Sequence, residues 1–206
     1  MEHISKRFGS FYANRDVSLS IREGEVHTLL GENGAGKSTL MNILVGLYQP
    51  TGGKILHRGR EVRINCPRDA AGLGIGMVHQ HFMLVEAMTA LENVVLGVKG
   101  ESPLLSRSAD RARIGALSER YGLDVELDSP VRELSIGAQQ RVEILKALYR
   151  GADLLVLDEP TAVLTDPEVE RLFDVMRSLT AEGKSAVFIS HKMREVMRIS
   201  DRITVL

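Results

Sequence analysis

Cysteine and long apolar runs are both scarce in this chain. Cys66 is the single cysteine among 206 residues, which excludes an internal disulfide framework and suits a reducing compartment. We expect Cys66 to be a small buried or half-buried residue. No stretch approaches the roughly 18 apolar residues of a membrane span, and the opening MEHISKRFGS lacks the apolar core of a signal peptide. These absences predict a soluble, cytoplasmic chain.

An excess of charge of one sign is also lacking. Lys and Arg number 26 against 27 Asp and Glu, so nothing points to nucleic acid held by phosphate neutralisation, and only a local basic patch stays open. With 44% hydrophobic and 26% charged residues, the chain is long enough for one α/β domain with a small subdomain. A second full domain does not fit, and the sequence shows no internal repeat.

The hydrophobic pattern changes along the chain. Apolar and polar residues alternate over residues 17–21 and 53–64, as in half-exposed strands, which predicts a small antiparallel layer. Solid apolar runs at 74–79, 154–158 and 185–190 are typical of parallel strands buried on both faces. We expect these runs to form the central sheet.

The stretch from about Met83 to Leu134 lies between two of these apolar runs and has a different hydrophobic pattern. It holds Pro103 and Pro130 together with amphipathic pieces such as RSADRARIGALSERYG, which favour helices joined by loops. We interpret this stretch as a helical insertion.

The most specific motif is a glycine-rich loop. Residues 31–39, GENGAGKST, fit the pattern G-x-x-x-x-G-K-[ST], which average residue usage would produce in a chain of this length with a probability of about one per cent. The apolar run VHTLL precedes the loop, and the helical pattern LMNILVGL follows it. Strand, loop and helix in this order predict a nucleoside triphosphate site, whereas a tight turn without a ligand is the alternative.

Each part of this loop has an expected task. Successive backbone N–H groups and the positive end of the following helix would hold the phosphates. Lys37 would reach the β- and γ-phosphates, Ser38 would offer its hydroxyl to Mg²⁺, and Thr39 would act on the α-phosphate side. The residues expected to contact the nucleotide are Gly31, Glu32, Asn33, Gly34, Ala35, Gly36, Lys37, Ser38 and Thr39.

Two adjacent carboxylates end the apolar run 154–158. Side chains alternate along a strand, so Asp158 and Glu159 should diverge at its C-terminal end, where open α/β sheets bind ligands. We assign Asp158 to Mg²⁺ and Glu159 the role of the general base that polarises the attacking water. Two solvated acids at a strand end are the alternative.

A histidine and a glutamine follow two other apolar runs. His191 comes directly after SAVFIS, where it can hydrogen-bond the γ-phosphate or the attacking water. Gln80 occupies a similar place after GMV, between His79 and His81. Because no further ligand stands at suitable spacing, we expect these two histidines to be loop or packing residues rather than a metal site.

Residues 134–141, LSIGAQQR, precede the helical pattern VEILKAL, and this signature segment resembles the LSGGQ motif of ABC ATPases. A serine hydroxyl and a glycine at a helix N-terminus form a second anion site. In ABC ATPases that site is offered to ATP bound by a partner cassette. Ser135 and Gly137 keep the motif, whereas Ile136 replaces a glycine and Ala138 the usual glutamine.

The resemblance covers essentially the whole chain, with the motifs in the family's order. It implies an α/β fold in which a P-loop NTPase core with a parallel sheet carries a small antiparallel β subdomain and an inserted α-helical subdomain. It implies one nucleotide-binding domain over residues 1–206. The core would take about 1–82 and 141–206, and the helical subdomain about 83–140.

The resemblance also implies roles for single residues. Phe8 stands where ABC cassettes place an aromatic that stacks on adenine, although a core position for Phe8, or the same role for Phe11 or Tyr12, stays open. In the family Gln80 contacts Mg²⁺ and links the site to the transmembrane partner. Lys37, Gln80, Glu159 and His191 would therefore carry out ATP hydrolysis, with ATP and Mg²⁺ as cofactors.

Within this family the chain resembles the ATP-binding subunits of bacterial simple-sugar and nucleoside importers, and MVHQHFMLV leans toward the nucleoside branch. Those subunits usually carry two cassettes in one chain, and this sequence resembles the first. Because it stops within an expected strand, DRITVL, we expect a fragment of a longer tandem-cassette chain.

The implied partners follow from that resemblance. They are a second ABC cassette, from the same longer chain or a homodimer, the transmembrane permease subunits and, indirectly, a solute-binding protein. Direct contact with nucleic acid is not expected. The permease would hold the chain peripherally on the inner face of the cell membrane. Thr165 stands where most members carry an Asp that contacts the partner cassette, with Asp166 beside it.

Two other classes of function stay open at this point. A soluble ABC ATPase acting on nucleic acid or the ribosome would carry coiled-coil arms or a charged linker, which this sequence lacks. A domain that only senses ATP would lack a catalytic base, and Glu159 argues against it. The transported solute stays open because membrane and solute-binding partners determine specificity.

Overall fold

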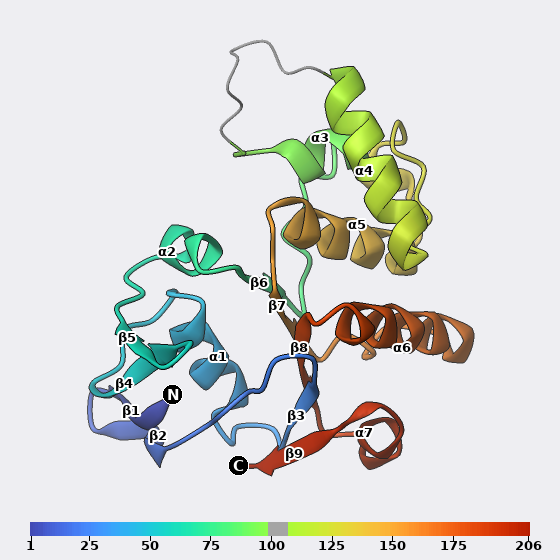
Figure 1. The fold of residues 1–206 in the computed structure, drawn as a ribbon. Coiled ribbons are helices and arrows are strands. Elements are labelled where there is room, and N and C mark those ends of the chain that lie inside the picture. Colours follow the sequence, from blue (N-terminus) through green and yellow to red (C-terminus); the bar gives the residue numbers. More distant parts are fainter. Residues whose placement is uncertain (99–106) are drawn as a thin grey trace.

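The computed structural model describes residues 1–98 and 107–206 (Figure 1). These described residues form helices and the strands of two sheets. Its elements, in chain order, are β1 (Glu2–Phe8), β2 (Phe11–Val17), β3 (Val26–Leu30), α1 (Lys37–Leu44), β4 (Gly52–His57), β5 (Arg60–Val62), α2 (Pro67–Gly72), β6 (Ile75–Val78), α3 (Ala90–Val95), α4 (Arg107–Tyr121), a 3₁₀ turn (Val131–Glu133), α5 (Ile136–Tyr149), β7 (Leu154–Asp158), α6 (Asp166–Ala181), β8 (Ser185–Ser190), α7 (Met193–Ile199) and β9 (Arg202–Val205).

The central sheet contains five parallel strands in the order β6-β7-β8-β3-β9. Its inner strands bury both faces, which confirms the expectation from the solid apolar runs. On β7, Leu155 and Leu157 belong to the hydrophobic cluster under α5 and α6. Val156, between them, belongs to the second cluster with Leu40 and Met41 of α1. Successive side chains along each strand therefore pack into two hydrophobic cores, one on each face of the sheet.

The smaller sheet is antiparallel, with strand order β2-β1-β4-β5. The alternating residues 53–64 supply β4 and β5, as predicted. The expectation of a strand over residues 17–21 was wrong, because β2 ends at Val17. The alternation there instead reflects Leu19, which is buried in the second cluster while its backbone N–H donates to the carbonyl of Met1.

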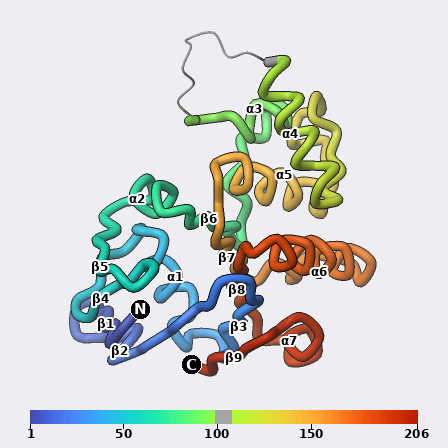
Figure 2. The backbone as a smooth tube through the Cα atoms, viewed as in Figure 1, coloured from blue at the N-terminus to red at the C-terminus, as the bar shows by residue number. Residues whose placement is uncertain are grey.

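The helices α3, α4 and α5 pack on one another, away from both chain ends (Figure 2). Where it is described, the stretch from about Met83 to Leu134 holds α3, α4 and the 3₁₀ turn joined by loops, and its part around Pro103 lies outside the described residues. Among residues 1–98 and 107–206, no helix is long and apolar enough to cross a membrane.

Cys66 is exposed, which corrects the expectation that it is buried or half-buried. It is the residue before the first turn of α2, where Pro67 begins the helix. The backbone N–H groups of Asn65 and Cys66 both donate to Oδ2 of Asp69, at 2.8 and 3.3 Å. This capping arrangement places residue 66 at a helix end on the surface rather than in a core.

Candidate functional site

The candidate catalytic and metal-binding residues of the sequence converge on one edge of the parallel sheet. The glycine loop 31–36 follows β3, Gln80 follows β6, Asp158 ends β7 and His191 follows β8. Because all these strands are parallel, their C-terminal ends meet at the same edge. The structure therefore assembles four segments that are far apart in sequence.

The loop between β3 and α1 has a backbone that only glycine adopts easily. Gly34 and Gly36 have φ angles of 89° and 92°. A Cβ atom on Gly36 would lie 2.3 Å from the carbonyl oxygen of Ala13, and the side chain of Asn14 donates a 3.1 Å hydrogen bond to the Gly36 carbonyl. Strand β2 thus packs directly on the loop and holds its shape.

Lys37 begins α1 and is buried, with its ammonium group inside the curve of the loop. Its Nζ donates to the carbonyls of Gly31 and Glu32, at 2.7 and 2.8 Å. The loop is therefore wrapped around a fixed positive charge next to the N–H groups that open the first helical turn. Such a concave, positive surface suits a polyphosphate.

Ser38 and Asp158 form an oxygen pair suited to a divalent cation. The Ser38 hydroxyl donates to Oδ1 of Asp158 at 3.2 Å. Burial raises the pKa of the Asp158 carboxyl above its usual value, and the nearby Glu159 adds to this, while the Ser38 hydrogen bond, His79 and Lys37 partly oppose it. A buried carboxylate that is costly to ionise gains from a bound cation, so the donor set fits Mg²⁺.

Glu159 and Asp158 diverge, as expected from their adjacent positions. The backbone of Glu159 is left-handed, with a φ of 45°, and its N–H donates to the carbonyl of Ile189 at 3.1 Å. Its carboxylate lies 3.4 Å from Nδ1 of His191. The Glu159 side chain is 17% exposed and that of His191 is 45% exposed. Both can therefore reach a water molecule at the sheet edge.

A cleft of about 440 Å³ opens over this edge. Phe8 is 45% exposed rather than a core residue, and Phe11 is 64% exposed. Both line the cleft, whereas Tyr12 is exposed but does not line it. The full lining is Phe8, Phe11, Ala13, Asn33, Gly34, Gly36, Lys37, Ser38, Thr39, Gln80 and Glu159.

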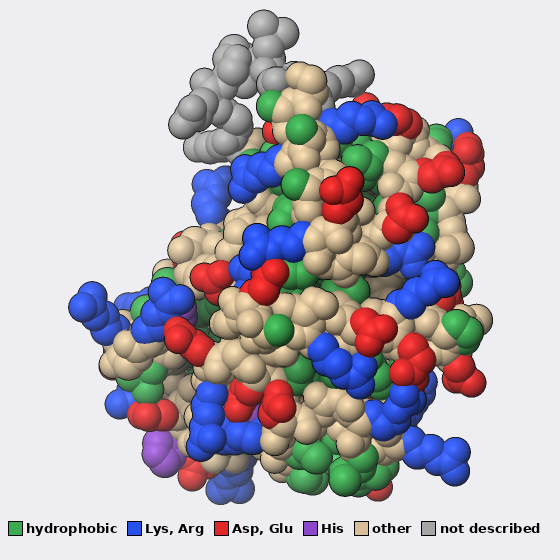
Figure 3. Space-filling view, turned by 45° about the vertical axis from the view of Figure 1, so that its right-hand side comes forward, with side chains coloured by type: hydrophobic (Ala, Val, Ile, Leu, Met, Phe, Trp, Pro, Cys, Tyr) green, Lys and Arg blue, Asp and Glu red, His purple; other side chains and the backbone are tan. Residues whose placement is uncertain are grey.

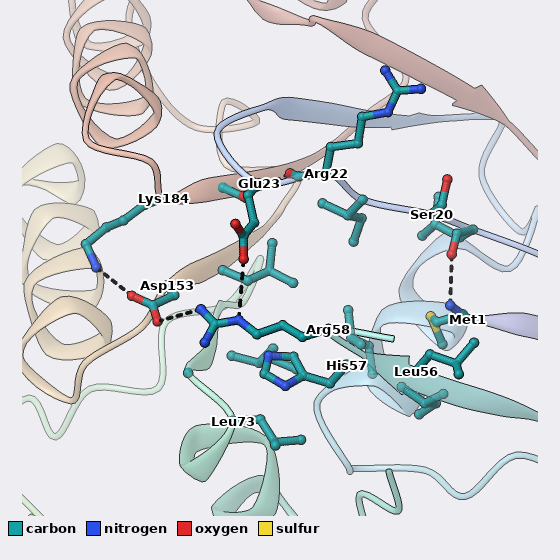
Figure 4. Close-up of a pocket in the computed structure, with 18 of the residues that line it drawn as sticks. Met1, Ser20, Arg22, Glu23, Leu56, His57, Arg58, Leu73, Asp153 and Lys184 are labelled. Carbon is teal, nitrogen blue, oxygen red and sulfur yellow. Dashed lines mark hydrogen bonds and ion pairs between the residues drawn. The ribbon is translucent and has the colours of Figure 1, made fainter. Parts of the chain in front are cut away.

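A larger cavity, of about 990 Å³, lies at the opposite edge of the sheet, where β6, β7 and β8 begin (Figure 4). Several of its charged groups form ion pairs with one another. Arg58 Nη2 lies 3.8 Å from Asp153 Oδ2, Lys184 Nζ lies 3.0 Å from Asp153 Oδ1, and Arg58 Nε lies 3.4 Å from Glu23. Open α/β sheets bind ligands at the carboxyl ends of their strands, so we assign the site to the smaller cleft.

The signature segment does not join that cleft. Ser135 is the N-cap of α5, and its Oγ accepts the N–H of Ala138 at 3.2 Å. Within the described ranges 1–98 and 107–206, neither Ser135 nor Gly137 is among the residues that line the cleft. These two residues therefore present a helix N-terminus that the chain does not aim at its own glycine loop.

The neighbourhood of Gly137 gives that glycine a structural role as well. A Cβ atom there would lie 2.2 Å from Oε1 of Glu168 on α6. Glu168 accepts the N–H and the hydroxyl of Thr165, at 2.9 and 2.8 Å, at the start of α6. Thr165 is thus the N-cap of α6 and forms a capping box with Glu168, but the bond from its hydroxyl is one that an aspartate could not donate.

Sequence reasoning missed three polar residues of α5, of which Gln140 and Glu143 are buried and Lys146 is half-buried. The Gln140 side chain donates to the carbonyl of Pro160 at 2.7 Å. The carboxylate of Glu143 accepts the N–H of Met83 at 2.8 Å, and Lys146 donates to the carbonyl of Met83 at 2.9 Å. The spacing of three between these residues, which places them on one helix face, is the signal that could have found them.

Comparisons with known proteins identify the family of the chain. The family model described as "ABC transporter" matches residues 14–162. The chain is 54% identical to the nucleoside import ATP-binding protein NupA of Lactococcus lactis and 52% identical to the guanosine import ATP-binding protein NupO of Bacillus subtilis. It is 47% identical to the glucose import ATP-binding protein TsgD13 of Haloferax volcanii. All of this chain is covered in each case, but it spans only 41%, 41% and 43% of these relatives' lengths.

Solved structures give the same result for the fold. A nucleotide-free ATP-binding cassette from an ABC transporter matches with a TM-score of 0.87 and 30% identity, covering 100% of this chain and 85% of that one. A dimeric cassette, MJ0796, in a post-hydrolysis state with ADP and Pi, matches with a TM-score of 0.84 and 30% identity, covering 100% and 92%. From its site, its fold and these relatives, the chain belongs to the ABC transporter family.

Proposed function

We propose that this chain is an ATP-binding and ATP-hydrolysing cassette that powers an importer for a small solute, a nucleoside or a simple sugar. One observation carries the proposal. The loop that surrounds Lys37, the Ser38–Asp158 pair and the Glu159–His191 pair lie at one edge of the sheet, and Lys37, Ser38 and Glu159 line the cleft there, whereas Asp158 and His191 lie beside it. This is the set of groups that phosphoryl transfer to water requires.

Nucleotide binding would use the cleft as follows. The adenine ring stacks on Phe8, which contacts Tyr48 edge-on at 5.5 Å and so presents a supported ring. The loop N–H groups and Lys37 hold the phosphates. Ser38, Asp158 and Gln80 would hold Mg²⁺, which when bound neutralises charge on the β- and γ-phosphates.

Hydrolysis would start from a water molecule next to Glu159. The Glu159 carboxylate accepts a proton as the water oxygen bonds to the γ-phosphorus and the bond to the β–γ bridging oxygen breaks, which yields ADP and phosphate. His191, which is paired with Glu159, orients the water or the γ-phosphate.

A second cassette would complete the site. Ser135 and Gly137 lie at the N-terminus of α5, outside the cleft of their own chain. We propose that this helix end, where Ser135 is exposed and Gly137 is buried, meets the triphosphate of another cassette. That cassette is either part of the same longer chain or a second copy. The dimeric structure of MJ0796, a relative at 30% identity, supports this arrangement.

The membrane partner would dock beside Gln80. A groove of about 200 Å³ runs between α5 and α2, with β6 and the segment that follows α1 completing its walls. Two of its lining residues, Leu47 and Met83, are 47% and 64% exposed. We propose that permease subunits dock on this apolar groove and thereby hold the chain at the inner face of the membrane. A solute-binding protein would act only through the permease.

The nucleoside branch is our first choice of solute, because the names of two relatives, NupA and NupO, specify nucleoside and guanosine import. Figure 3 shows Lys and Arg side chains interspersed with Asp and Glu over the face that it draws, which supports a solute transporter over a protein that grips nucleic acid.

The full-length chain, co-purified with its membrane subunits and assayed with its solute-binding protein, tests the proposal. We expect nucleosides to stimulate ATP hydrolysis.

The Glu159→Gln variant should hydrolyse ATP about 100- to 1000-fold more slowly yet bind it and trap a closed dimer. Glu170→Gln, at an exposed ion pair with Arg198, should match the parent protein. Unchanged hydrolysis in Glu159→Gln would overturn the catalytic assignment, and stimulation by sugars alone would overturn the nucleoside preference.

A further inference from the structure

The turn that follows β7 holds a backbone conformation that it would not adopt alone. Glu159 is the residue in the left-handed region, with a φ of 45°, which is unfavourable for a side chain with a Cβ. A hydrogen bond from the N–H of Ala162 to the Glu159 carbonyl, at 3.2 Å, closes the turn. A strained residue at a functional site persists only where its surroundings determine it. The surroundings of this turn therefore decide where the Glu159 carboxylate points.

Three elements hold the turn from three sides. β8 accepts the Glu159 N–H at the carbonyl of Ile189. From α7, Glu195 accepts the hydroxyl of the buried Thr161 at 2.5 Å. Just before that helix, Lys192 donates to the Thr161 carbonyl at 3.0 Å. The remaining residue of the turn is Pro160, and α5 supplies its contact.

Gln140 provides that contact from a buried position on α5. Its Nε2 donates to the Pro160 carbonyl at 2.7 Å, and only 3% of the residue is exposed. Proline has no N–H group, so the carbonyl is the one backbone group by which Pro160 can be held. Among the hydrogen bonds of the described residues, this is the one that the Pro160 carbonyl receives.

We infer that Gln140 is a positioning residue for Glu159: its amide holds the Pro160 carbonyl and so fixes the left-handed turn that aims the carboxylate. The inference rests on the proposed function of Glu159 as the base. Because Gln140 is on the helix that Ser135 caps, the signature segment and the turn that carries the base form one hydrogen-bonded unit. Gln140 itself does not line the nucleotide cleft.

A double-mutant cycle tests this indirect role. We would compare the full-length chain in its membrane complex with Gln140→Met, Glu159→Gln and the double variant, and measure single-turnover hydrolysis at saturating ATP and Mg²⁺. Methionine keeps the length of the side chain but removes the donor. Gln140→Met should slow hydrolysis about 10- to 100-fold, the cost of misplacing a reacting group by about 1 Å. The affinity for ATP should stay within about twofold of the parent value, because the donor does not touch the nucleotide.

The decisive comparison is made in the Glu159→Gln background. If Gln140 acts through Glu159, adding Gln140→Met there should change the residual rate less than about twofold. An equal loss in both backgrounds, or a parental rate in Gln140→Met, would overturn the inference. If Glu159→Gln hydrolyses at the parental rate, the proposed function fails instead, whatever Gln140→Met does.

Two further variants guard against a trivial loss of folding. Gln49→Met removes a similar bond, from Gln49 to the carbonyl of Ile64 at 3.0 Å, and should keep the parental rate. Gln140→Asn keeps the amide but shortens its reach by one methylene, so it should fold and yet lose hydrolysis as Gln140→Met does. A parental rate in Gln140→Asn, together with an unfolded Gln140→Met, would assign Gln140 to stability alone.

Discussion

Two neighbouring carboxylates differ because the backbone turns between them. Asp158 is the last residue of β7 and is 7% exposed, whereas the left-handed conformation of Glu159 directs its carboxylate toward His191. The buried carboxylate suits a cation and the more exposed one suits a water molecule. Environment rather than residue type therefore separates their tasks.

A pH-dependent stability follows for Asp158. Burial raises its folded-state pKa above the usual value of 3.8, so the ionised form is penalised in the folded state. The contribution of Asp158 to stability is then greatest below pH 3.8 and is lost as the pH rises through the raised pKa. The Asp158→Asn variant should show a higher melting temperature than the parent in the nucleotide-free state at pH 7, with a difference that shrinks toward pH 4.

Thermal unfolding followed by circular dichroism, without nucleotide or divalent cation, measures this difference. Asp174→Asn provides the control, because Asp174 is 73% exposed in an i,i+3 pair with Arg177. Added ATP with Mg²⁺ should stabilise the parent more than Asp158→Asn. A lower melting temperature of Asp158→Asn at pH 7 would contradict our account of the buried carboxyl.

At the level of elements, the segment that follows β6 is held by helices on both of its sides. α5 holds Met83 through Glu143 and Lys146. α3 holds Val85 and Thr89 through Asn93, which is fully buried. Gln80 is therefore only three residues from a segment whose path is fixed by the helical layer, by which we mean the packed helices α3, α4 and α5.

Asn93→Ala should destabilise the chain by about 2–3 kcal/mol, because the backbone N–H and carbonyl of Val85 lose partners at 2.7 and 3.0 Å. Urea denaturation of the nucleotide-free chain would measure this free energy of unfolding. The exposed Asn65 offers a matched substitution, and Asn65→Ala should change it by less than about 0.5 kcal/mol. Equal effects of the two variants would count against the proposed support by Asn93.

At the level of the whole molecule, the helical layer and the sheet core are also joined far from the nucleotide cleft. Tyr121, at the end of α4, donates to Glu182 just beyond α6, with an Oη to Oε2 distance of 2.5 Å. Arg120 donates to the other oxygen of the same carboxylate at 2.7 Å. The helical layer and the sheet core are therefore joined both at α5 and at the bonds of Tyr121 and Arg120 to Glu182, which we call the outer contact.

The ionisation of Tyr121 reports on that contact. Burial, with the hydrogen bond to Glu182 and its negative charge, raises the pKa of Tyr121 to about 12. Its contribution to stability is therefore present below pH 10 and is lost as the pH rises through 12. Glu182→Gln should lower the pKa of Tyr121, as measured by absorbance at the wavelength of tyrosinate directly after a pH jump.

Glu170→Gln, a charge loss within α6, controls for the change in net charge and should leave the pKa of Tyr121 unchanged. A Tyr121 pKa that does not move in Glu182→Gln would show that the outer contact does not form.

The sequence by itself determined the strands that carry the candidate site and predicted the chemistry of that site. The glycine loop and the two carboxylates are contiguous motifs, and each follows an apolar run long enough to be recognised as a buried strand. Because parallel strands end at one edge, even the meeting of Gln80, Asp158 and His191 could be expected before any coordinates.

Only the tertiary structure decided how those groups are held. Gln140 meets Pro160 across 20 residues and Glu143 meets Met83 across 60, and no local pattern encodes such pairs. Folding also decided that Cys66 is exposed at a helix end and that Leu19 is buried without a strand around it. The physical reason is the same throughout: local sequence selects elements and reactive groups, but a buried polar side chain acquires its role from the partner that packing brings to it.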